Sequence, residues 1–214
     1  YPIARPGYGV RPRDDRDFQG SFRIGYSEAE NALYLAVEMQ DESAVIDRLN
    51  PTSRDTQDGC EVYLDARHER EKEVPVGQYY LLGDTPGAYG SEVKLADFKV
   101  AVHRDPFVQR CEWRIDIQKK TQGQVQLRPG MSLGFDLAIN DRDADGSFSE
   151  VTWGPSGGLG DVLLVGEAAA RGTVKVAVRW EGSGAEAGYV KVQIQPLGQA
   201  EEQWQARTDG KGLC

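Results

Sequence analysis

Acidic side chains are concentrated in one stretch, residues 133–153, which reads LGFDLAINDRDADGSFSEVTW. Asp141, Asp143 and Asp145 alternate along it, and a glycine follows. Alternating carboxylates beside a glycine that permits a tight turn are typical of loops that bind a hard cation such as Ca2+. The spacing is not that of an EF-hand, because the twelfth position counted from Asp141 is Thr152 rather than glutamate. Two interpretations stay open: a calcium-binding loop and a solvated Asp/Gly turn between strands.

Four further side chains could bind a ligand beside this stretch. Glu61 and Tyr63 share one face of the segment CEVYLDA, Asn140 ends the segment LGFDLAIN, and Trp153 closes the acidic stretch. An aromatic ring stacks on the apolar face of a sugar ring, while carboxylates and amides meet its hydroxyls. Two alternatives also fit: Glu61 and Tyr63 on an ordinary solvated sheet face, and Trp153 in core packing at a sheet edge.

Other chemistry is not expected from the residue pattern. No acid is isolated among apolar residues as a general acid would be, so the chain is not expected to be an enzyme. The two histidines, His68 and His103, belong to no metal-spaced cluster and there is no C-x-x-C, so neither zinc nor haem is expected. The glycines of GPSGGLGD lack the Lys-Ser/Thr of a nucleotide-binding loop. The formal net charge of -9, without a basic cluster, makes nucleic acid an unexpected partner.

The elements that must position these side chains are strands. Segments such as ALYLAVEM, CEVYLDA and LGFDLAIN alternate apolar and polar residues, turn residues separate them, and no long segment has a helical period. The sequence therefore predicts an all-β fold, an antiparallel β-sandwich over residues 14–168. Residues 1–13, rich in proline and glycine, are interpreted as a linker, and residues 169–214 as a partial second β domain.

Cysteine usage leaves the compartment open. Cys60 and Cys111 are in phase with the apolar residues of their strands, so they form either a buried disulfide or two free core thiols. No apolar run is long enough to cross a membrane, and no signal peptide is present. We expect a mature or excised fragment whose membrane association, if any, lies in flanking segments. The oligomeric state is not specified by these patterns.

The order of phrases resembles a known family. DFQGSFRIGYSEAENALYLAVEMQDES, DGCEVYLDAR, EWRIDI and LRPGMSLGFDLAINDRDADG, followed by Trp153, resemble family-nine carbohydrate-binding modules and the broader DOMON-like β-sandwich group. The resemblance implies a non-catalytic module that binds a saccharide outside the cytoplasm, extracellular or periplasmic, between two tryptophans. Glu61 matches a family glutamate that binds sugar. The tryptophan expected just before that strand is absent from SRDTQDG, which leaves Trp153 as one aromatic wall.

Two functions follow from this resemblance. The first is saccharide recognition by Glu61, Tyr63, Asn140 and Trp153, with Ca2+ held at Asp141, Asp143 and Asp145. The alternative is the ectodomain of a sensor or surface protein, in which a degenerate sugar site leaves an interaction or spacer domain. The segment from TVKVAVRW to TDGKG is similar to the start of a carboxypeptidase-regulatory-like or related immunoglobulin-type domain.

Overall fold

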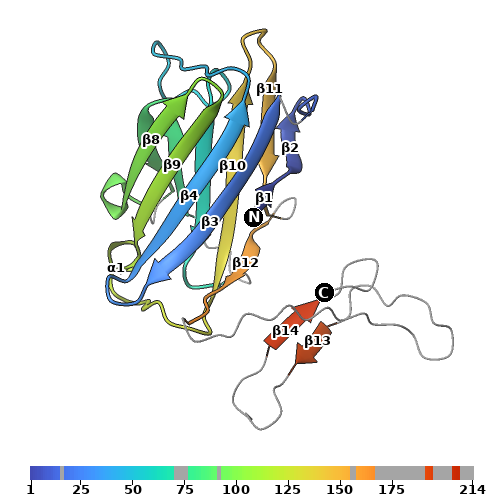
Figure 1. The fold of residues 1–214 in the computed structure, drawn as a ribbon. Helices are drawn as coiled ribbons and strands as arrows, with labels where there is room; N and C mark the ends of the chain where they lie inside the picture. Colours follow the sequence, from blue (N-terminus) through green and yellow to red (C-terminus); the bar gives the residue numbers. More distant parts are fainter. Residues whose placement is uncertain are drawn as a thin grey trace, which may run out of the picture. The chain divides into compact units, whose positions relative to one another are not determined.

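The computed structural model describes residues 1–14, 17–69, 77–90, 93–154, 158–166, 191–194 and 204–207. The chain divides into two compact units, Tyr1–Glu167 and Ala168–Cys214. The first unit carries two antiparallel sheets packed face to face, which confirms the predicted all-β sandwich (Figure 1).

The smaller sheet has five strands in the order β1-β3-β4-β9-β8. Its strands are β1 (Pro2–Ile3), β3 (Phe18–Ser27), β4 (Ala32–Asp41), β8 (Phe98–Asp105) and β9 (Val108–Asp116). The larger sheet runs β2-β11-β10-β5-β6-β7, and β12 also pairs with β10. Its strands are β2 (Arg5–Gly9), β5 (Gly59–Asp65), β6 (Gly77–Leu82), β7 (Thr85–Tyr89), β10 (Ser132–Arg142), β11 (Phe148–Thr152) and β12 (Gly160–Leu163). Two short helical turns, η1 (Leu95–Asp97) and α1 (Ile117–Lys120), complete the unit.

The core lies between the sheets because alternate residues of each strand are apolar. On β5, Cys60, Val62 and Leu64 are buried in it, and on β10 the inward residues include Phe135 and Leu137. The outer face of the larger sheet therefore carries the other half of each strand. Both Cys60 and Cys111 are buried free thiols, which resolves the alternative left open by the sequence. Burial raises the pKa of the Cys111 thiol to about 12.

Residues 1–13 are not simply a linker, because they contribute two strands. β1 pairs with β3 of the smaller sheet, and β2 pairs with β11 of the larger one. The missed signal is a short strand that contains Pro6 at the edge of a sheet, where a missing N–H is tolerated.

In the second unit, β13 (Lys191–Ile194) pairs antiparallel with β14 (Trp204–Arg207). The other strand expected there, TVKVAVRW, lies outside the described residues. Across the described residues, no helix has the length and apolar character needed to span a membrane.

Candidate functional site

The outer face of the larger sheet carries a polar network centred on Glu61. Its side chain points away from the core of the sandwich. Glu61 is nevertheless only 1% exposed, because polar neighbours cover it. One carboxylate oxygen accepts hydrogen bonds from the Tyr63 hydroxyl (2.5 Å) and from Gln78 Nε2 (2.6 Å). The other accepts from Asn140 Nδ2 at 2.6 Å. A buried carboxylate needs such partners, since each unmet acceptor would cost about 1–3 kcal/mol.

Arg54 supplies a cation to this network from the long loop between β4 and β5. Its Nε lies 3.3 Å from Glu61 Oε1 and 3.4 Å from Asn140 Oδ1, and its Nη2 pairs with Glu150 on β11. One guanidinium therefore reaches side chains on three adjacent strands. The loop that carries it is held by buried Gln57, whose Nε2 donates to the Ser53 carbonyl at 2.9 Å.

Three of the four predicted ligand-binding residues come together here. Glu61, Tyr63 and Asn140 share the outer face of β5 and β10, where Asn140 and Glu61 are joined by a hydrogen bond. Trp153 is placed elsewhere. Its ring packs at 5.5 Å from Phe22 and 5.7 Å from Phe135, so the alternative of packing at the sheet edge describes it better than a binding wall.

Three members of the network were not singled out from the sequence. Gln78 and Glu150 are outward residues of alternating strands, but their meeting with Glu61 depends on a strand order that alternation does not specify. Arg54 lies in the polar segment SRDTQDG, which gives no periodic signal.

A first cluster of acids lies between the sheets at one end of the sandwich. Asp41 ends β4, Asp58 precedes β5, and Asp141 lies near the end of β10. All three are buried, and one oxygen of each lies within 4.8 Å of the others. Asp58 accepts from the backbone N–H groups of Val45 and Arg142, at 2.8 and 2.9 Å. Both oxygens of Asp141 are buried without a hydrogen-bond partner.

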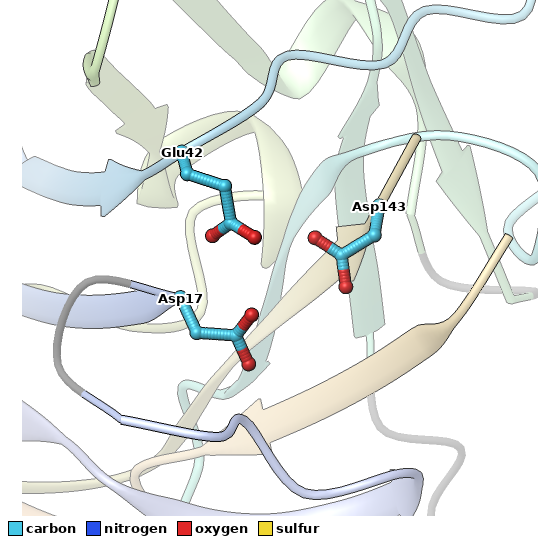
Figure 2. Close-up of side chains that lie close together, drawn as sticks. All are labelled: Asp17, Glu42 and Asp143. Atoms are coloured by element: carbon cyan, nitrogen blue, oxygen red, sulfur yellow. The ribbon is translucent and has the colours of Figure 1, made fainter. Parts of the chain in front are cut away.

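A second cluster adjoins the first. The carboxylates of Asp17, Glu42 and Asp143 converge from the start of β3, the end of β4 and the end of β10 (Figure 2). Arg13 partly neutralises the cluster, because its Nη2 lies 2.7 Å from Asp17 and 2.8 Å from Glu42. Asp143 Oδ1 is buried without a partner.

The predicted metal set is therefore divided. Asp141 belongs to the first cluster and Asp143 to the second, while Asp145 belongs to neither. Asp145 accepts hydrogen bonds from the backbone N–H and the hydroxyl of Ser147, at 2.9 and 2.7 Å, and the backbone bond lowers its pKa. Alternation along the loop suggested one site, but Asp141 lies with Asp41 and Asp58, whereas Asp143 lies with Asp17 and Glu42.

Burial and mutual repulsion oppose ionisation of all three carboxyl groups of the first cluster when no cation is bound. Burial, with repulsion from neighbouring carboxylates, raises the pKa of Asp41 to about 7 and that of Asp141 to about 8. Burial also raises the pKa of Asp58 to about 6, against its backbone hydrogen bonds. Carboxylate oxygens packed this closely, with unpartnered lone pairs, form the donor set that a hard divalent cation prefers.

The raised pKa values determine how stability should change with pH in a chelator. The folded state binds more protons than the unfolded state between about pH 4 and about pH 8, so the free energy of unfolding falls as pH rises through that window. We expect a higher melting temperature at about pH 5 than at about pH 8. Thermal unfolding monitored by circular dichroism in the presence of EDTA measures the melting temperature at each pH. The D141N variant should show a much smaller difference between the two melting temperatures.

Comparisons with known proteins assign the chain to a family. A family model described as "Carbohydrate family 9 binding domain-like" matches residues 6–158. A family 9 module from Caldicellulosiruptor kristjanssonii in complex with glucose is 18% identical and has a TM-score of 0.61, covering 80% of this chain and 86% of that one. A family 9 module from the same organism in complex with cellotriose is 18% identical and has a TM-score of 0.58, covering 80% and 87%.

A search of curated proteins finds no match. The family model covers well over half of the chain, including the four strands and the loop that carry the Glu61 network and the strand ends that carry the acid clusters. The chain belongs to the carbohydrate family 9 binding domain-like family.

Proposed function

We propose that the chain is a non-catalytic module that binds a saccharide on the outer face of the larger sheet, around Glu61. The observation that carries the proposal is the network in which Glu61 organises Arg54, Gln78 and Asn140 on that face. Saccharide hydroxyls both donate and accept hydrogen bonds, and the network offers both kinds of group. Membership of a carbohydrate-binding family supports it, as do the related modules that bind glucose and cellotriose.

The same network favours binding over hydrolysis. A glycoside hydrolase needs a carboxylic acid free to protonate the leaving oxygen. Glu61 instead accepts from Tyr63, Gln78 and Asn140 and pairs with Arg54, so its oxygens are already committed to side chains. Such a group orients its partners for binding.

The test is calorimetric titration of the whole chain with glucose and with cellotriose. We expect saturable binding of at least one of them, together with amide chemical-shift changes centred on β5, β6 and β10. No heat and no shift across a wider panel of neutral, acidic and amino sugars would contradict the proposal. That outcome would favour the alternative, an interaction or spacer domain of a sensor or surface protein.

We also propose that Ca2+ binds at the two acid clusters. In the first, Asp41, Asp58 and Asp141 would hold the ion. In the second, Asp17, Glu42 and Asp143 would do so. The ion would supply positive charge that offsets the repulsion among buried carboxylates and joins the ends of both sheets. The two unpartnered oxygens of Asp141 support the first site most directly.

We propose that the module works outside the cytoplasm, extracellular or periplasmic. Saccharide polymers are recognised there, and extracellular modules use calcium sites of modest affinity. Expression of the full-length protein followed by fractionation and protease accessibility of this segment would test the location. Recovery only from the cytosol would contradict it.

A further inference from the structure

Tyr80 occupies the strand next to Glu61 on the outer face of the larger sheet. In the register of the sheet, Glu61 on β5 lies opposite Tyr80 on β6, and Tyr80 lies opposite Gly87 on β7. The flanking residues Tyr79 and Leu81 are buried in the core, so Tyr80 faces outward. Directly paired residues place their Cβ atoms about 4.5–5.5 Å apart, so the Cβ of Tyr80 lies beside Glu61. The ring extends to the other side, over Gly87 on β7, so a saccharide of more than one ring that crosses β6 can meet both Tyr80 and the Glu61 network.

The end of the Tyr80 ring lies over Gly87 on the neighbouring strand. A Cβ added at Gly87 would sit 2.1 Å from Cζ, 2.3 Å from Cε2 and 2.3 Å from the hydroxyl oxygen of Tyr80. Only a glycine leaves the space that this ring fills, since any other side chain would lift the ring from the sheet. The ring therefore reaches over the backbone of β7, and Tyr80 is only half-buried there.

Tyr80 differs from the neighbouring tyrosines in what its side chain contacts. The Tyr63 hydroxyl donates to Glu61, and the Tyr79 ring packs 5.0 Å from the Phe98 ring. Within the described part of the chain, the half-buried Tyr80 has neither a side-chain hydrogen bond nor an aromatic partner. Its outward ring face and its hydroxyl are therefore available to a ligand.

We propose that Tyr80, seated on Gly87, is the stacking platform for a pyranose ring of the bound saccharide. This inference rests on the proposed function and adds the aromatic surface that Trp153 does not provide. The apolar C–H face of the sugar lies on the Tyr80 ring. A saccharide that stacks there and extends across β6 brings its hydroxyls to Gln78 on the same strand and to the Glu61 network on β5.

A set of single variants tests whether the Tyr80 ring binds the sugar or only contributes to the fold. Y80F keeps the ring and should bind cellotriose within about twofold of the wild type, whereas Y80L should bind about tenfold more weakly. G87A does not alter any group proposed to touch the sugar, yet its Cβ displaces the ring, so we expect a similar loss of about tenfold. G25A is the control, because a Cβ at that exposed strand position meets nothing within 4 Å.

Calorimetry measures the affinities, and saturation-transfer NMR detects contact between tyrosine ring protons and the sugar C–H protons. Saturation transfer present in the wild type and in Y80F but absent in Y80L would support the platform. Wild-type binding with unchanged affinity and transfer in Y80L would overturn the platform while leaving the proposed function standing. No binding by the wild type would instead contradict the proposed function and the platform together. Melting temperatures of each variant identify any loss caused by unfolding.

Discussion

Adding calcium to chelator-treated protein is expected to raise the melting temperature by about 10 °C. Saturation at about a thousand times the dissociation constant stabilises the folded state by about 4 kcal/mol, and each kcal/mol corresponds to about 2–4 °C for a domain of this size. The reason is that the ion converts the buried, mutually repelling carboxylates of Asp41, Asp58 and Asp141 into its ligands. Differential scanning fluorimetry across a calcium titration measures the shift.

Two asparagine substitutions make this expectation specific. D141N replaces a carboxyl group whose ionisation burial and neighbouring carboxylates oppose and whose oxygens have no partner. The metal-free variant should therefore melt above the metal-free wild type and respond much less to calcium. D145N is the matched control from the same loop, since Asp145 is exposed and belongs to neither cluster, and its calcium response should equal that of the wild type. A full response in D141N, or a lost response in D145N, would contradict the assignment of the first cluster.

Replacing Glu61 is expected to affect both stability and binding. E61A leaves the Arg54 cation, two amides and the Tyr63 hydroxyl without their shared acceptor, so the free energy of unfolding should fall by about 3 kcal/mol. Chemical denaturation measures that loss. Saccharide binding should fall below detection, because the groups that meet the ligand lose their fixed positions.

E61Q distinguishes the loss of the site from the loss of the fold. The amide keeps the shape and one acceptor oxygen, so the variant should stay folded yet bind at least about tenfold more weakly than the wild type. E112Q, a similar change at an exposed position on the smaller sheet, should change neither property. Normal affinity in a folded E61Q would show that the ligand binds elsewhere.

Alternation predicted the strands and the inward residues of the fold. It identified the outward faces of CEVYLDA and LGFDLAIN, and so placed Glu61, Tyr63 and Asn140 correctly on one surface. These strands pair directly, as β5 and β10, and that pairing makes the three residues neighbours. Alternation thus indicates the face on which each residue lies, whereas the contact between Asn140 and Glu61 depends on a strand pairing that it does not specify.

The remaining site residues depend on contacts that no local pattern encodes. Asp41 and Asp58 lie in the sequence as ordinary polar residues at strand ends, and only the packing of the two sheets brings them to Asp141. Arg54 reaches the site because a long loop, held by Gln57, folds over the sheet. Trp153 had two interpretations, because a tryptophan at a strand end fits an exposed platform and an edge of the core equally well, and its ring packs against Phe22 and Phe135.

Because side chains alternate along β10, the number of residues in this strand decides which way the side chains of both proposed sites face. Asn140 faces the outer network, and Asp141, the next residue, faces the acid cluster between the sheets. Deleting one residue upstream in this strand would exchange these two directions and disable both sites at once, whereas deleting two would preserve them. Anyone grafting a new ligand specificity onto this face should therefore keep the loop that carries Arg54 and change the length of β10 only by even numbers.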